Sequence, residues 1–198
     1  MEKIDLLVWN DAALDAARSL KVDGVVSVAV SRAARLDGAT LLMGRGSELA
    51  GLVELWVQSV DVWPQLVEQV ESDAYLVTES IPQPKSATAG LLTHLTWFPK
   101  PGRLSEDDFF HGWHIVHTPS SASLHPLRQG YVRDAVARRL THGSPPVRAI
   151  VSEFFAEDVY LDPSRLFGDG DALTRTMEEL PLYADQADIS SCPVWREG

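Results

Sequence analysis

Residues 81–85 read Ile-Pro-Gln-Pro-Lys, and they separate two stretches of chain that have the same predicted order of strands and helices. Proline cannot donate a backbone hydrogen bond, so this stretch marks a break between regular elements. The elements predicted before the break are strand 3–9, helix 12–20, strand 25–30, strand 52–59, helix 61–70 and strand 74–78. Their order is βαββαβ.

The same order follows the break. The predicted elements are strand 91–98, a helix beginning at Ser105, strand 130–140, strand 147–155, helix 172–180 and strand 189–195. Ser105 with Asp108 three residues later is a variant of the capping box that starts helices. Each half matches a ferredoxin-like unit, whose sheet has helices on one face and must cover the other. The sequence therefore predicts an α+β protein with two ferredoxin-like halves, residues 1–82 and 89–198, packed sheet to sheet as an α+β barrel around a pocket.

Composition narrows the function classes. The chain of 198 residues has a formal net charge of −11 and no basic stripe, which argues against binding nucleic acid or an anionic membrane. The N-terminus lacks a signal pattern and no apolar run approaches transmembrane length, so we expect a cytoplasmic location. The single cysteine, Cys192, cannot form an internal disulfide, and we expect a buried thiol rather than a nucleophile.

All six histidines lie between His94 and His142, and three of them fall in the stretch Phe-Phe-His-Gly-Trp-His-Ile-Val-His-Thr-Pro at residues 109–119. On a helix of 3.6 residues per turn, Phe110, Trp113 and His117 share one apolar face, flanked by Phe109 and Val116. Pro119 is expected to end this helix just after His117. A helix C-terminus favours imidazolium and burial opposes it, so we expect His117 to keep a pKa near neutral. That pKa suits a general acid or base.

Two other interpretations of this stretch stay open. His117 could be a core histidine that packs on Trp113 and bonds a loop carbonyl. A metal site from His111, His114 and His117 is disfavoured, because the outer two side chains diverge by about 120° on a helix.

Further polar residues could reach the same interior. If Leu91, Leu95 and Trp97 face the helices, strand alternation turns His94 and Thr96 toward the barrel lumen. His125 lies in a Ser-rich loop that could close over a pocket, and Tyr131 opens the next strand. Three of them also have a purely structural interpretation. His94 could be a strand residue whose hydrogen bonds are satisfied, His125 a surface loop residue, and Tyr131 a packing residue.

Three segments together resemble the EthD-domain family: Lys-Pro-Gly-Arg-Leu-Ser-Glu-Asp-Asp-Phe at 100–109, Trp113-x-x-x-His117-x-Pro119, and Gly-Tyr-Val at 130–132. The resemblance covers residues 92–133 and is weak elsewhere. The first half has no comparable helix, so one active pocket per chain is implied. The resemblance further implies the fold of dimeric α+β barrels, cofactor-free chemistry, and His117 as the proton donor or acceptor with Trp113 beside it.

The resemblance, together with the position of His117, implies a cofactor-independent lyase or isomerase, such as a decarboxylase, dehydratase or cyclase. Its substrate would be a hydrophobic, aromatic or polyketide-like small molecule. His117 is the predicted catalytic residue, and the predicted substrate-binding residues are Trp113, His94, His125, Tyr131 and Phe110. A non-catalytic small-molecule-binding protein is one alternative, and a haem or metal protein is a weaker one. Sheet edges left unpaired could join two chains, so a homodimer is also open.

Overall fold

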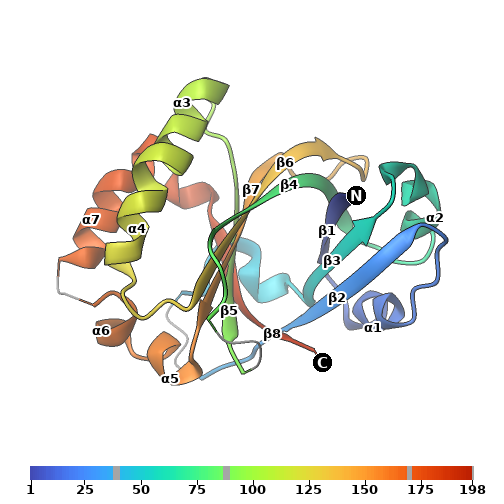
Figure 1. Ribbon diagram of the computed structural model, residues 1–198, viewed down its shortest axis with the longest axis horizontal. Helices are drawn as coiled ribbons and strands as arrows, with labels where there is room; N and C mark the ends of the chain where they lie inside the picture. The colour runs from blue at the N-terminus through green and yellow to red at the C-terminus, as the bar shows by residue number, and fades with distance from the viewer. Residues whose placement is uncertain (38–40, 87–89, 169–170, 198) are drawn as a thin grey trace.

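The computed structural model describes residues 1–37, 41–86, 90–168 and 171–197. In this part of the chain, eight antiparallel strands close into one barrel in the order β1-β3-β2-β8-β5-β7-β6-β4 (Figure 1). The strands are β1 (Glu2–Val8), β2 (Val25–Ala33), β3 (Gly51–Val57), β4 (Asp73–Gln83), β5 (Leu92–Pro99), β6 (Gly130–Arg139), β7 (Val147–Phe155) and β8 (Ser190–Arg196). The predicted α+β barrel is therefore present, and β7 has its predicted bounds.

Two sets of four strands make up the barrel. The first set has the order β4-β1-β3-β2, and the second repeats it as β8-β5-β7-β6. The sets join along their edges rather than face to face. The join between β4 and β6 runs from Tyr75 to Gln83, whereas the join between β2 and β8 pairs only Ser31 to Ala33 of β2. Edge pairing gives the outer strands partners for their N–H and C=O groups.

Helices cover the outside of the barrel unevenly. The first four strands carry α1 (Asp11–Arg18) and α2 (Trp63–Val67), with the short turn η2 (Val60–Val62). The turn η1 (Gly44–Glu48) packs against β8. The last four carry the thicker layer on the other side of the molecule (Figure 1). That layer consists of α3 (Glu106–Phe110), η3 (His111–His117), α4 (Thr118–Leu124), α5 (Glu157–Tyr160), α6 (Pro163–Leu166), α7 (Ala172–Glu179), η4 (Leu180–Leu182) and η5 (Gln186–Asp188). Among the described residues, no helix is long and apolar enough to cross a membrane.

Both faces of the sheet are buried. On β1, Ile4 and Leu6 pack under α1 and α2, whereas Leu7 points into the barrel and joins an apolar cluster with Trp97 and Ile150. An eight-stranded barrel is just wide enough for side chains to fill its interior. The lumen is therefore largely core, and the pocket that we expected there lies elsewhere.

The faces of β5 are the reverse of those predicted. Leu95 and Trp97 belong to the apolar cluster inside the barrel, and His94 and Thr96 point outward toward the helices. The predicted alternation is correct, but its assignment to the two faces was wrong. The physical reason is that the lumen needs large apolar side chains to fill it, whereas the helical layer outside leaves a cavity into which polar groups can point.

A cluster of charged residues occupies the remainder of the lumen. The ammonium of Lys3 lies 2.9 Å from Glu54, 2.7 Å from Glu79, 2.9 Å from Asp134 and 3.7 Å from Asp5. Burial raises the pKa of Asp134 to about 6, although the Lys3 charge opposes this. Among the described residues, Asp5, Glu54 and Asp134 are also the one acidic group whose oxygens lie close enough together to hold a metal ion, within 4.8 Å. Lys3 already lies among these carboxylates and links strands of both sets.

Candidate active site

The long helix of the second half begins as the sequence predicts. Ser105 is the N-cap residue of α3, and its side chain accepts a hydrogen bond from the backbone N–H of Asp108 at 3.0 Å. The Ser105 hydroxyl also donates to the Asp108 carboxylate at 2.7 Å. This pair fixes the start of the helix and therefore the positions of the aromatic residues that follow.

The helix does not end at Pro119, which corrects the prediction. Residues His111–His117 form a π-helix, and α4 continues to Leu124 with Thr118 in helical geometry. Pro119 has no N–H to donate. Hydroxyls supply donors to the backbone here: Thr118 Oγ1 to the Trp113 carbonyl at 2.8 Å, and Ser120 Oγ to the His117 carbonyl at 2.9 Å. His117 therefore lies inside a longer helix, without the stabilisation of imidazolium expected at a helix C-terminus.

The π-helix changes which side chains point inward. Phe109 and Trp113 are fully buried, and the His117 side chain is 12% exposed, but Val116 is on the surface. Phe110 stacks on Trp113, with ring centroids 6.3 Å apart, and lies under Arg148. Phe110 lines no cavity described here, so the structure does not bring this predicted ligand-binding residue to the site. A period of 3.6 residues is wrong for this segment, since π turns bond i to i+5.

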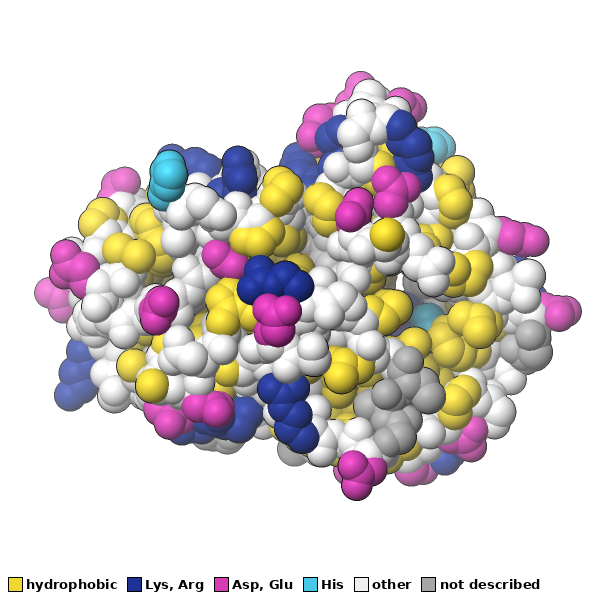
Figure 2. Space-filling model, turned by 180° about the vertical axis from the view of Figure 1, so that it is seen from behind, with side chains coloured by type: hydrophobic (Ala, Val, Ile, Leu, Met, Phe, Trp, Pro, Cys, Tyr) yellow, Lys and Arg dark blue, Asp and Glu magenta, His cyan; other side chains and the backbone are white. Residues whose placement is uncertain are grey.

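A cavity of about 280 Å³ separates the outer face of β5 and β7 from the helices. Its polar wall groups are His94, Thr96, His117, His125 and Glu153. Its apolar wall includes Leu173 and Met177 of α7, which are 50% and 39% exposed and form part of the opening. Figure 2 shows a hollow on this side of the molecule, bordered by hydrophobic side chains, with a histidine at its base.

A smaller cavity of about 70 Å³ continues from this one. The two share Thr96, His117, Glu153 and Tyr183, and the smaller one ends against Trp113 and Tyr131. The structure thus gathers five of the six predicted site residues around two adjoining cavities. Larger hollows are present elsewhere, such as one of about 530 Å³ at the barrel mouth near Trp56 and Glu79, but no histidine lines it.

His117 is oriented by an acidic residue of α7. Its Nδ1 lies 3.0 Å from Glu179 Oε2, and the same oxygen accepts a hydrogen bond from Ser120 at 2.6 Å. The Tyr183 ring packs on the imidazole with centroids 4.6 Å apart. Burial lowers the pKa of His117, while Glu179 and Glu153 oppose this effect. A neutral ring that donates from Nδ1 to Glu179 keeps its lone pair on Nε2, which makes Nε2 the atom able to accept a proton.

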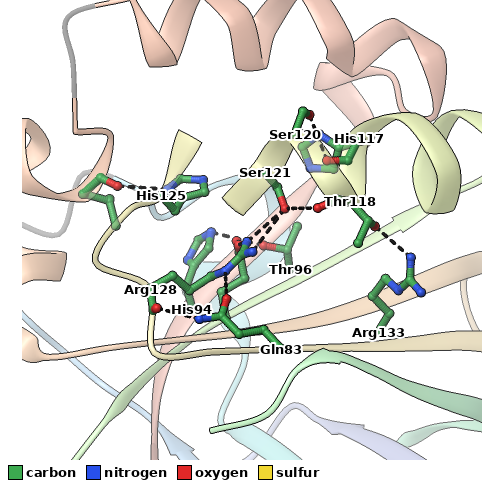
Figure 3. A network of polar contacts seen from close by, with 12 residues as sticks. Gln83, His94, Thr96, His117, Thr118, Ser120, Ser121, His125, Arg128 and Arg133 are labelled. Carbon is green, nitrogen blue, oxygen red and sulfur yellow. Dashed lines mark hydrogen bonds and ion pairs between the residues drawn. The ribbon is translucent and has the colours of Figure 1, made fainter. Parts of the chain in front are cut away.

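His94 lies deeper, on β5. Its Nδ1 is 3.2 Å from the Tyr160 hydroxyl, and its Nε2 is 3.1 Å from Thr96 Oγ1. Figure 3 shows His94 beside Thr96. The residue is 6% exposed, and burial lowers its pKa to about 4. His94 is therefore a neutral group at pH 7 with both nitrogens engaged by hydroxyls.

His125, Tyr131 and Trp113 complete the predicted set. His125 is the C-cap residue of α4, and its Nδ1 lies 2.9 Å from the Leu166 carbonyl, which orients the ring at the cavity wall. Tyr131 is 2% exposed, and burial raises its pKa to about 12, so it stays a phenol at neutral pH. Trp113 is 1% exposed and closes the smaller cavity.

The sequence analysis missed a buried ion pair at this site. Glu153 Oε1 lies 2.6 Å from Arg128 Nη1. Arg128 is held in turn by Gln83 at 3.1 Å and by the Ser121 hydroxyl at 3.2 Å (Figure 3). Its guanidinium also lies over the ring of Tyr131. Burial alone would raise the pKa of Glu153, but the charges of His125, Arg128 and His94 outweigh it and hold that pKa at about 2. In the sequence, the one feature that indicates this ion pair is a single acidic residue within the apolar strand 147–155.

Comparisons with known proteins support the fold only. No protein-family model matches the chain, so the resemblance to the EthD-domain family stays a prediction. No curated protein matches it either. The crystal structure of an anthrone oxidase-like protein is similar over 100% of this chain and 91% of its own, with a TM-score of 0.62 and 10% identity. A Fusobacterium nucleatum protein named "Putative monooxygenase" is similar over 98% and 90%, with a TM-score of 0.52 and 7% identity. The fold is thus similar to that of the dimeric α+β barrels.

Proposed function

We propose that this protein is a cofactor-independent enzyme of the lyase or isomerase type, acting on a hydrophobic, aromatic or polyketide-like small molecule. His117 is the general base, and then the general acid, of the reaction. The observation that carries the proposal is the His117–Glu179 contact at the wall of an apolar cavity, which leaves Nε2 as the ring nitrogen that Glu179 does not engage. Proton transfer by a positioned histidine contributes about 10²–10⁴-fold to a rate.

The other predicted residues have supporting roles in this proposal. Tyr131 is a phenol at pH 7, so its hydroxyl can donate a hydrogen bond to a carbonyl or hydroxyl of the substrate, and the neutral ring of His94 contacts the substrate at the wall of the larger cavity. Trp113 provides an aromatic wall, and His125 borders the larger cavity. Residues 89–198 form the half that carries the site, and residues 1–82 form a second ferredoxin-like half without one. The repeated strand order supports this division.

The names of the two similar structures favour a second candidate, an oxidation in the same cavity. Such a reaction would also begin with proton removal by His117, but it would consume dioxygen. A non-catalytic binding protein would use the same cavity, but it would form no product and consume no dioxygen.

The test is turnover of a panel of hydroxylated aromatic compounds, followed by mass spectrometry and dioxygen uptake. We expect a product of equal or lower mass with no dioxygen consumed, and loss of this product in His117→Ala. His111→Ala is the matched control, since His111 lies on the same helix segment but is exposed. Dioxygen consumption would support the oxidase, binding without any product would support the binding protein, and full activity of His117→Ala would exclude the assigned role.

A further inference from the structure

One ionised group at the cavity wall takes no part in the proposed proton transfer. Glu153 lies on β7 directly between its sheet partners, His94 on β5 and Tyr131 on β6. Strand register therefore turns the three side chains to the same face, where the two cavities meet. Glu153 lines both cavities, and its side chain is 14% exposed.

Arg128 binds Glu153 from behind. It contacts Glu153 Oε1, its remaining donors go to Gln83 and Ser121, and its side chain is only 2% exposed. Arg128 lines neither cavity, so a ligand would meet the carboxylate and not the guanidinium. The hydrogen bond from Arg128 goes to Oε1, so the second oxygen, Glu153 Oε2, is the one left to meet a ligand at the cavity wall.

The remaining wall groups do not offset this negative charge with a fixed cation. No lysine or arginine is found among the described residues that line the two cavities. His94 is neutral, and its nitrogens are engaged by Tyr160 and Thr96. A carboxylate in such surroundings attracts hydrogen-bond donors strongly and repels anions.

We propose that Glu153 determines ligand specificity: Oε2 accepts a hydrogen bond from a hydroxyl or N–H group of an uncharged aromatic ligand, and its charge excludes ligands that carry a carboxylate. This inference rests on the proposed function, because it concerns the same cavity. Of the reactions considered there, it favours dehydration or isomerisation of a neutral hydroxylated compound over decarboxylation of a carboxylate.

The experiment measures binding of 2-naphthol, naphthalene and 2-naphthoate at pH 7 by quenching of tryptophan fluorescence. These probes share one ring system. 2-Naphthol adds a hydrogen-bond donor, naphthalene has no polar group, and 2-naphthoate carries an anionic carboxylate. We expect the wild-type protein to bind 2-naphthol about tenfold or more tightly than naphthalene, the size expected for a hydrogen bond to a charged group, and not to bind 2-naphthoate. In Glu153→Gln the advantage of 2-naphthol should fall several-fold, and 2-naphthoate should bind, because Arg128 loses its anionic partner.

Glu157→Gln is the matched control, since it makes the same chemical change at a neighbouring exposed position and should keep the wild-type preference. The wild-type measurement decides the inference even if Glu153→Gln fails to fold. Equal binding of 2-naphthol and naphthalene, or tight binding of 2-naphthoate, would overturn the role of Glu153 and leave the proposed function standing. Failure of all three probes to bind would overturn both.

Discussion

At the scale of single residues, Glu179 decides which nitrogen of His117 can react. Its carboxylate engages Nδ1 and is itself held by Ser120, so rotation of the ring breaks the contact with a carboxylate that is fixed in place. A neutral imidazole held in this way has one acceptor atom, Nε2, and His117 lines the cavity. Glu179 is therefore a positioning residue that acts through His117.

We predict that Glu179→Gln lowers the pKa of His117 further, because the wild-type carboxylate raises it against the effect of burial. The acid limb of the pH–rate profile should move to lower pH. The rate should also fall about 10–100-fold, because the His117 ring is no longer held in one tautomer, and a loss of this size is typical of removing an orienting partner. Histidine NMR titration and the pH dependence of kcat/KM check this. Glu178→Gln, an exposed neighbour on α7, should leave both unchanged.

His94 makes stability depend on pH. Its pKa is lowered to about 4 in the folded protein, from an ordinary value of 6.5, so the unfolded chain binds a proton first as pH falls. Its contribution is therefore fully present above pH 6.5 and is lost progressively toward pH 4, by on the order of 3 kcal/mol. Urea unfolding at pH 7 and pH 5 should show a smaller loss in His94→Gln than in the wild type. An equal loss in both proteins would contradict this assignment.

At the scale of elements, η4 is packed tightly against the π-helix. A Cβ atom at Gly112 would lie 2.2 Å from the Leu182 carbonyl oxygen, so any larger residue must push η4 away. Tyr183 follows η4 and packs on His117, which links this contact to the site. The absence of a side chain at Gly112 therefore sets the distance between the imidazole and its aromatic neighbour.

We predict that Gly112→Ala destabilises the protein by about 1–3 kcal/mol, the usual cost of overpacking, and weakens ligand binding by displacing Tyr183. Thermal unfolding and 2-naphthol binding measure the two effects. Gly102→Ala is the control, because nothing lies within 4 Å of a Cβ atom there. Similar stability of the two variants would show that η4 moves at no cost.

Most elements could be predicted from the sequence, and the failures have local causes. Strand 147–155 has strong β-formers and clear boundaries, so its range was correct. The faces of β5 were wrong because both faces of the barrel sheet are buried, which removes the contrast between a polar and an apolar side. The end of the helix at Pro119 was wrong because Pro119 falls in the first turn of α4, directly after the π-helix, where its missing N–H is tolerated. Glu153 was missed because its partner, Arg128, lies 25 residues away in the chain.

At the scale of the whole molecule, Lys3 holds the two sets of strands together from inside. It pairs with Glu54 and Glu79 of the first set and Asp134 of the second. Loss of the ammonium would leave several carboxylates buried without a counter-charge. Removing one partner of a buried ion pair costs about 3–5 kcal/mol.

We therefore predict that Lys3→Met lowers the free energy of unfolding by about 3–5 kcal/mol at pH 7. The loss should shrink at pH 5, because protonated carboxyl groups no longer need the ammonium, and the pKa of Asp134 is already raised to about 6. Chemical denaturation at both pH values gives the two numbers. Lys21→Met, at an exposed position, serves as the control.

The placement of His117 Nε2 at a ligand cavity outside the barrel can be tested directly by 15N NMR of the histidine rings with and without saturating 2-naphthol. We predict that His117 is protonated on Nδ1 and unprotonated on Nε2 at pH 7. Its Nε2 resonance should move when the ligand binds, while the resonances of the exposed His111 stay in place. A His117 ring protonated on Nε2, or a resonance that stays unchanged at saturation, would contradict the account.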